Sequence, residues 1–213
     1  MNAEIPPPAK EPQTDPLGPR SSEFIFYAAL FEGALIMLAL LLSAVGLFDP
    51  AQPLSRLSWE RQLLPGLIWG AAGTLPLLIL LMAVERLSFW PFGALSRITD
   101  EQVRPLFAGT ALYELLLVSL LAGLGEELLF RWSIQGGLST WLGSDFGQVL
   151  AVALAAALFG LCHFLNLAYA AVTFVIGLYF GAMMCLSGTW IAPAIAHAAY
   201  DFLALCYLTR WTR

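Results

Sequence analysis

Long apolar runs recur along this chain and constrain its fold more than any other feature. A membrane helix needs roughly 20 apolar residues to cross about 30 Å of hydrocarbon. Such runs predict membrane helices at residues 24–48, 63–84, 106–134, 149–168, 170–187 and 189–208. Barrel strands would instead alternate in polarity over about ten residues, and no such pattern occurs. The sequence predicts an all-α polytopic membrane protein with about six transmembrane helices.

Composition agrees with a lipid environment. The chain has 213 residues, of which 59% are hydrophobic and 12% charged, whereas a soluble domain has about 45–50% and about 25%. A single globular core of this length cannot bury so many apolar residues. We therefore expect the lipid bilayer to be the partner that surrounds the chain. Three scattered cysteines form neither a metal-binding pair nor a disulfide framework. No basic patch indicates a nucleic-acid partner.

The first 22 residues differ from the rest. They contain six of the 13 prolines and no apolar run, which is typical of a disordered tail. They also lack the apolar region of a secretory signal. We therefore predict a Pro-rich tail at residues 1–22 and a transmembrane bundle at residues 23–213.

Basic residues predict the orientation of the bundle. With six helices, seven of them fall on one side: Lys10, Arg20, Arg86, Arg97, Arg104, Arg210 and Arg213. Arg56 and Arg61 fall on the other. The positive-inside rule then predicts a cell-membrane protein with both termini in the cytoplasm. Residues 86–98 are read as an interfacial segment, with Trp90 at headgroup depth.

Several ionisable residues interrupt the apolar runs. They are Glu32, Glu114, Glu126, Glu127, Arg131, His163, His197 and Asp201. A charged side chain at the bilayer centre costs about 2.5–3.5 kcal/mol. Several are tolerated only where they face one another or a wet cavity, which makes them functional candidates.

Spacing indicates how these residues are grouped. Residues four apart share a helical face, so Glu127 and Arg131 are predicted to pair. Glu126 lies about 100° round the same helix. The same spacing of four relates Phe159 to His163 and His197 to Asp201. Counting residues from the helix ends places the three groups at depths that agree within about 10 Å. The match improves if the third helix continues to a cap at residues 136–137.

Each of these ionisable residues also has a structural interpretation. Glu32 and Glu114 each fall near a predicted helix start without a paired motif, which favours a structural or interfacial role. Arg131 is read as a structural partner that fixes Glu127. A single histidine would be read as a satisfied buried residue, but two histidines with two carboxylates favour a functional site. Pro193, four residues before His197, either frees backbone groups near the site or starts the helix.

Two kinds of hydrolytic chemistry suit such a group. Neutral imidazoles and a carboxylate hold zinc and leave a position open for water. Alternatively, the carboxylate acts as general base toward water, while the histidines orient it and stabilise the oxyanion. The helical HExxH zinc motif is absent, which favours the second.

Three motifs resemble those of a known family. They are Glu126-Glu127-x-x-x-Arg131, Phe159-x-x-x-His163 and His197-x-x-x-Asp201. Together and in this order they resemble the signature of the CPBP intramembrane proteases, which include CAAX prenyl endopeptidases and the abortive-infection proteins. The resemblance covers residues 106–208, the predicted catalytic core.

The resemblance implies a role for each residue. Glu126 corresponds to the glutamate that activates water, and His163 to the histidine that helps to hold it. Glu127 and Arg131 correspond to a supporting pair, and His197 to a residue that stabilises the oxyanion. The implied enzyme needs no cofactor, with zinc as the alternative, and cleaves protein or peptide substrates in or near the membrane.

Asp201 departs from the family pattern, because asparagine is common there in the prenyl-protein enzymes. An ionised aspartate cannot donate a hydrogen bond. Either Asp201 is protonated, or it orients His197, or the oxyanion is stabilised in another way.

The competing hypothesis is a non-catalytic membrane scaffold or a proton-coupled transporter. Transporters also gather carboxylates and histidines at mid-membrane. They usually carry internal repeats with broken helices in matching halves, and the sequence shows neither.

Overall fold

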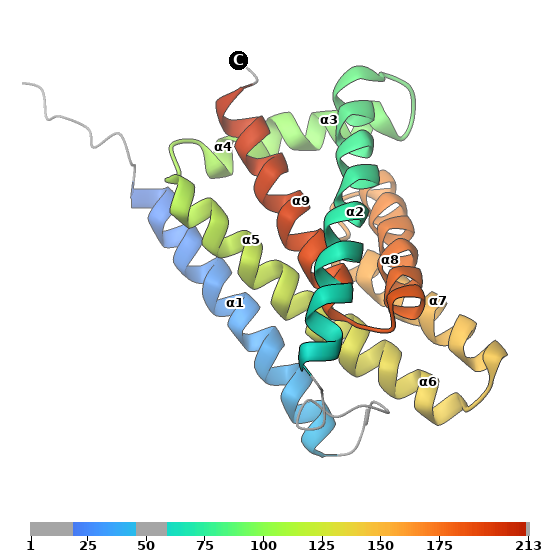
Figure 1. The fold of residues 1–213 in the computed structure, drawn as a ribbon. Coiled ribbons are helices and arrows are strands. Elements are labelled where there is room, and N and C mark those ends of the chain that lie inside the picture. Colours follow the sequence, from blue (N-terminus) through green and yellow to red (C-terminus); the bar gives the residue numbers. More distant parts are fainter. Residues whose placement is uncertain (1–18, 46–58, 212–213) are drawn as a thin grey trace, which may run out of the picture.

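The computed structural model describes residues 19–45 and 59–211, and every regular element in this part of the chain is a helix (Figure 1). The elements are α1 (Pro19–Ala44), α2 (Trp59–Arg86), α3 (Phe92–Ile98), the π-helix η2 (Thr99–Val103), α4 (Arg104–Phe107), α5 (Leu112–Glu127), the π-helix η3 (Leu128–Gln135), α6 (Gly136–Leu142), α7 (Asp145–Cys162), α8 (Leu167–Ser187) and α9 (Ile191–Arg210). The predicted all-α fold is confirmed.

The number of membrane spans also agrees with the prediction. Five helices, α1, α2, α7, α8 and α9, are long and apolar enough to cross a membrane. A sixth span is counted if residues 92–107 and 112–142, which meet at a bend of 119°, are taken as one broken span. Large apolar side chains such as Phe31, Ile79 and Leu186 are exposed on these helices, as expected for side chains that face lipid. The chain is a multi-pass membrane protein.

Some predictions concern residues that are not described. Residues 1–18 of the predicted tail lie outside the described part, as do Lys10, Arg56 and Arg213. Helix α1 begins at Pro19, inside the range predicted as tail.

The start of the third predicted helix was wrong. Residues 106–111 are not its first turns, because the chain leaves α4 through extended backbone at Ala108 and a left-handed Gly109 with φ of 79°. Helix α5 then begins at Leu112, where the Glu114 carboxylate accepts a hydrogen bond of 2.8 Å from the backbone N–H of Ala111. The structural role predicted for Glu114 is confirmed, since this contact caps the helix.

The end of the same helix also differs from expectation. The chain continues beyond Glu127 through η3 and α6 to Leu142, where Gly143 with φ of 62° closes the last turn. Residues 136–137 therefore lie inside a helix and do not cap it. A left-handed glycine after the last turn is the usual end of a helix.

Residues 92–107 form a crosspiece at one end of the bundle (Figure 1). Arg104 links the crosspiece to α2, because its guanidinium lies 2.8 Å from Glu85 of that helix. Within the crosspiece, the same guanidinium lies 2.6 Å from Asp100. The guanidinium also donates a hydrogen bond of 2.8 Å to the Leu208 carbonyl of α9. Just before the crosspiece, Trp90 is 65% exposed, which suits the predicted interfacial position.

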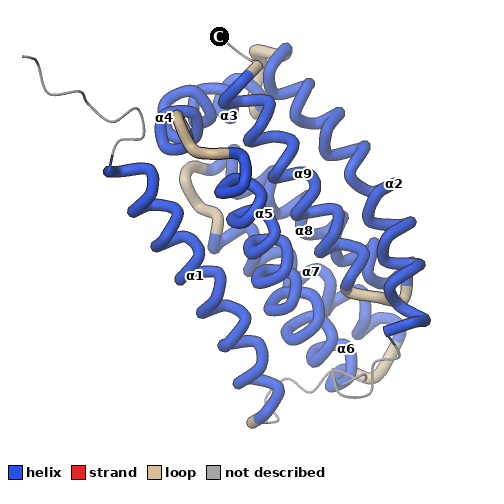
Figure 2. The backbone as a smooth tube through the Cα atoms, turned by 60° about the vertical axis from the view of Figure 1, so that its left-hand side comes forward, coloured by secondary structure: helices blue, strands red, loops and turns tan. Residues whose placement is uncertain are grey.

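Helix α9 runs through the bundle and packs against α2, α5 and α8, while α1 packs along α5 and η3 (Figures 1 and 2). Small residues allow the close approach. A Cβ added to Gly123 of α5 would lie 2.7 Å from the Ala194 carbonyl oxygen and the Ala198 nitrogen of α9. Close contact through small residues is the usual way in which membrane helices pack. It holds the His197 turn of α9 against the carboxyl end of α5.

Candidate active site

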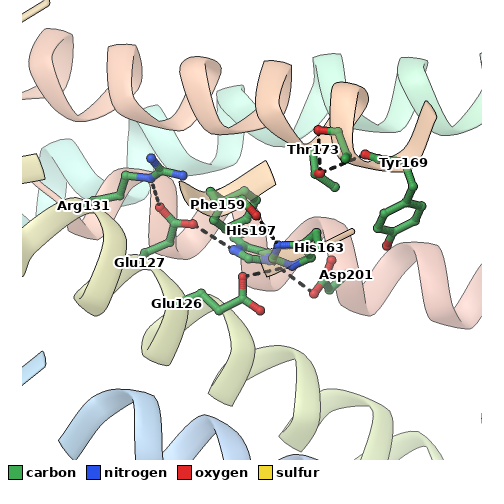
Figure 3. Close-up of polar contacts among 10 residues, drawn as sticks. Glu126, Glu127, Arg131, Phe159, His163, Tyr169, Thr173, His197 and Asp201 are labelled. Carbon is green, nitrogen blue, oxygen red and sulfur yellow. Dashed lines mark hydrogen bonds and ion pairs between the residues drawn. The ribbon is translucent and has the colours of Figure 1, made fainter. Parts of the chain in front are cut away.

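The six predicted site residues lie together in the middle of the bundle (Figure 3). The carboxyl end of α5 supplies Glu126 and Glu127, and η3 supplies Arg131. His163 follows the last residue of α7, and α9 supplies the remaining two residues. Segments far apart in the sequence thus converge on one site. The π-helix η3 directly follows the two glutamates, and π-helical turns are frequent at functional sites.

Glu127 and Arg131 form the predicted ion pair. Their Oε2 and Nε atoms are 2.9 Å apart, and neither side chain has exposed surface. The guanidinium carbon also lies 5.0 Å from the centre of the Phe159 ring, within the range of a cation–π contact. The pair is therefore enclosed by protein, and the charge on Glu127 is balanced where lipid and water do not reach it.

His197 lies between two carboxylates. Its Nδ1 is 3.0 Å from Glu127 Oε1, and its Nε2 is 3.4 Å from Asp201 Oδ2. When both nitrogens carry a proton, each donates to the carboxylate that it faces. The ring also stacks on Phe180 of α8, with centroids 5.2 Å apart. These contacts fix the plane of the imidazole from both edges and one face.

Pro193 lies in the first turn of α9, which begins at Ile191. The backbone nitrogens of a first turn have no partner within the helix, so proline is tolerated there. Of the two roles considered for Pro193, starting the helix is the one that the structure supports.

His163 faces Glu126 across the site. Its Nε2 lies 3.5 Å from Glu126 Oε2, and its Nδ1 lies 2.8 Å from the Phe159 carbonyl oxygen. Because a carbonyl oxygen only accepts, Nδ1 must carry the proton and donate to it. In the neutral ring Nε2 is then an acceptor. Two acceptor atoms, one from each residue, thus face each other when the ring is neutral, whereas a protonated ring donates from Nε2 to the carboxylate.

The position of His163 in its helix corrects a prediction. The fourth helix was expected at residues 149–168, with His163 inside it. Helix α7 instead ends at Cys162, and α8 begins at Leu167 after a short connection. At this helix end the Phe159 carbonyl accepts two hydrogen bonds from His163, one from its backbone N–H and one from its Nδ1–H. The spacing of four still brings the two residues together, with ring centroids 4.4 Å apart.

A cavity of about 380 Å³ opens onto Glu126, His163, His197 and Asp201. Ligand pockets commonly measure about 300–1,000 Å³. The other walls are mostly apolar and come from α1, α2, α8, α9 and the crosspiece. A small volume lined by apolar groups and by ionisable side chains that include these four suits hydrolytic chemistry.

One residue with a predicted structural role lines this cavity. Glu32 was placed near a helix start, but it lies in the middle of α1 and is only 8% exposed. The expected place near a helix start was wrong, whereas the structural or interfacial role stays a prediction. Its charge inside an apolar run was the available signal. What the sequence did not show is that α1 packs against the end of α5 that carries Glu126.

The zinc alternative was tested against the donor groups. Among residues 19–45 and 59–211, no group of three His, Cys, Asp or Glu side chains is arranged to hold a metal ion. The carboxylates and imidazoles instead contact one another in pairs.

Residues 108–203 match the model of one protein family, described as type II CAAX prenyl endopeptidase Rce1-like. Comparisons with curated proteins and with solved structures gave no match. The matched segment contains all three motifs and the helices that bring them together. The resemblance seen in the motifs is thereby confirmed: residues 108–203 match the Rce1-like family of type II CAAX prenyl endopeptidases.

Proposed function

We propose that this chain is an intramembrane endopeptidase that hydrolyses peptide bonds of membrane-associated proteins or peptides with water activated by Glu126. Its family supports a CAAX-type peptidase in general. The observation that carries the finer proposal is that Glu126 Oε2 and His163 Nε2 lie 3.5 Å apart at the cavity, and both are acceptors when the ring is neutral.

A water molecule bound between these two atoms donates one O–H to each of them. Its lone pair then points away from both, toward a carbonyl carbon in the cavity. As the oxygen attacks, Glu126 takes a proton from the water, while His163 keeps the water oriented through the other O–H. General-base catalysis of this kind contributes about 10²- to 10⁴-fold to a rate.

His197 is proposed to stabilise the oxyanion. Glu127 holds its Nδ1 at 3.0 Å, whereas the contact of Nε2 with Asp201 is longer, at 3.4 Å. The Nε2–H is thus the more available of the two donors. Of the three roles considered for Asp201, orienting His197 is the one that this contact favours. A fixed donor aimed at developing negative charge lowers the barrier most in a site that excludes water.

Glu127 and Arg131 support this arrangement without contacting substrate. Arg131 balances the charge of Glu127, and Glu127 in turn orients His197. We propose that the reaction needs no metal or other cofactor, because a carboxylate base and an oriented imidazole supply both functions.

The proposed orientation places both termini in the cytoplasm of a cell-membrane protein. The start of α1, the crosspiece and the end of α9 lie at the same end of the bundle (Figure 1). Phe24 and Phe107 make an edge-to-face contact there with ring centroids 5.3 Å apart, and Arg210 donates a hydrogen bond of 3.1 Å to the Thr110 carbonyl. Arg86, Arg97 and Arg104 lie in or beside the crosspiece, and this excess of basic residues favours the cytoplasmic side.

The test compares protein termini in membranes of cells that make the native chain and cells that make Glu126→Gln at equal abundance. A Glu114→Gln chain serves as control, because Glu114 caps α5 away from the site. New termini are expected with the native and control chains and not with Glu126→Gln. Full cleavage by Glu126→Gln would contradict the assignment, and the absence of new termini with a folded native chain would favour a scaffold or transporter.

A further inference from the structure

Glu32 of α1 is a third carboxyl group in the catalytic cavity, alongside Glu126 and Asp201. It lies outside residues 108–203, the segment that matches the family. The residue is only 8% exposed, and its Oε2 is buried without a hydrogen-bond partner. Buried polar atoms without a partner are uncommon in proteins and point to a missing ligand or a functional role.

The backbone holds Glu32 close to the glutamates of α5. A Cβ added to Gly125 would lie 2.8 Å from the Glu32 carbonyl oxygen and 3.1 Å from Glu32 Oε2. Only glycine leaves room for this approach. Gly125 directly precedes Glu126, so the absence of a side chain at one position sets the distance of α1 from the catalytic turn.

The surroundings of Glu32 disfavour a negative charge. None of the ion pairs in the described part of the chain includes it. Arg131 is the guanidinium of the site and is paired with Glu127. The titratable neighbours of Glu32 are Glu126 and Asp201, which repel its charge, and His163 and His197, which attract it only when they are protonated and which contact those carboxylates.

A protonated Glu32 avoids both the burial of an unpaired charge and the repulsion from its neighbours. Peptide hydrolysis also needs a proton donor, because the amine cannot leave as an anion. Glu126 begins the reaction as a base and so carries no proton to donate at the start. Glu32 lies on α1 and lines the same cavity as the two histidines.

We propose that Glu32 is the general acid of this site, a protonated carboxyl group that donates its proton to the leaving amine. This inference rests on the proposed peptidase function. Water loses one proton to Glu126 as the new C–O bond forms. The C–N bond then breaks as the nitrogen takes the proton of Glu32. Transfer of the proton from Glu126 to Glu32 restores both groups, and one water is consumed per bond cleaved.

The protonation state can be tested without a substrate. Infrared spectra of the purified full chain in phosphatidylcholine nanodiscs at pH 7 report the C=O stretch of protonated carboxyl groups. The native chain is expected to show such a band, which shifts in D₂O, is lost in Glu32→Gln and is retained in Glu114→Gln. A native chain without the band, or a band unchanged in Glu32→Gln, would overturn the proposal. Because no activity is measured, this result is independent of the proposed peptidase function.

The donor role is tested with two synthetic substrates. Their sequence is taken from a cleavage site found in the terminus comparison, and the scissile bond is an amide in one and an ester in the other. An ester releases an alcohol, which needs much less help from an acid than an amine does. Glu32→Gln is expected to lower kcat for the amide by about 100-fold, to lower kcat for the ester much less, and to leave KM unchanged.

Glu32→Asp keeps a carboxyl group and is expected to recover part of the amide rate. It is the control for the case in which Glu32→Gln loses activity because it misfolds. An equal loss on both substrates would show a structural role and overturn the donor assignment. If the native chain cleaved neither substrate, the peptidase function itself would fail, and the donor role with it, whatever the infrared result.

Discussion

Glu127 and Arg131 form an ion pair with 2.9 Å between Oε2 and Nε, and the side chains of both are completely buried. The two outer nitrogens of the guanidinium have no hydrogen-bond partner. The pair therefore contributes to folding stability only while both partners are present. If one partner is removed, the other is left as a buried charge.

Arg131→Met is expected to destabilise the protein by about 3–5 kcal/mol, because it leaves the Glu127 carboxylate without its main partner. The double variant Arg131→Met with Glu127→Gln should recover much of this loss, since no unpaired charge remains. Thermal unfolding in detergent measures both. Arg97→Met is the control, because Arg97 is exposed and bonds only within its own helix. A double variant no more stable than Arg131→Met would contradict the explanation.

Gly125→Ala is expected to destabilise the protein by about 1–3 kcal/mol, as overpacking of a filled contact does. It should also lower peptidase activity, because α1 and Glu32 must move away from the catalytic turn. Gly33→Ala on α1, next to Glu32, is the control, since a Cβ there meets nothing within 4 Å. That change should be neutral or stabilise the helix by up to about 1 kcal/mol. Similar effects of the two substitutions on activity would contradict the importance of the close approach.

Asp201→Asn is expected to keep most of the activity, because the amide oxygen still accepts a hydrogen bond from His197 Nε2. Asp201→Leu removes the acceptor and should lower kcat by about 10- to 100-fold, the equivalent of about 1.5–3 kcal/mol for a hydrogen bond to a charged group. Cleavage rates of the two variants measure the difference. If Asp201→Asn were as slow as Asp201→Leu, the negative charge itself would be required.

Strong chelators are expected to leave cleavage unchanged, because the proposed mechanism assigns water activation to Glu126 alone. The measurement is the cleavage rate after prolonged dialysis against EDTA and phenanthroline, together with the zinc content of the purified protein. Activity lost on dialysis and restored by zinc would assign the activation of water to a metal ion.

Local sequence patterns predicted much of this molecule. The length of the apolar runs predicted the number of spans, because hydrocarbon thickness fixes helix length. The spacing of four predicted the contact of Glu127 with Arg131, because helical geometry brings such residues together wherever the helix packs. The depths counted along the runs placed the two histidines near the glutamates, and the structure does so too.

Features that depend on packing were not predicted. Hydropathy did not distinguish residues 106–111 from a membrane helix, because the left-handed Gly109 is a backbone feature within an apolar stretch. Hydropathy also does not show that α7 ends at Cys162, because the residues that follow are largely apolar. Glu32 was missed for a further reason, because its neighbours belong to a helix more than 80 residues away in the sequence.

The cavity has a wider consequence for the segment that carries the family motifs. Phe24 of α1, Leu81 of α2 and Leu95 of the crosspiece form part of its wall, and all three precede residue 108. Residues 108–203 thus hold the reactive groups but not the whole enclosure around them. Without the earlier helices, acyl chains would fill the space in which a peptide must meet water. The smallest unit able to keep this cavity within the bilayer is therefore larger than the segment that matches the family.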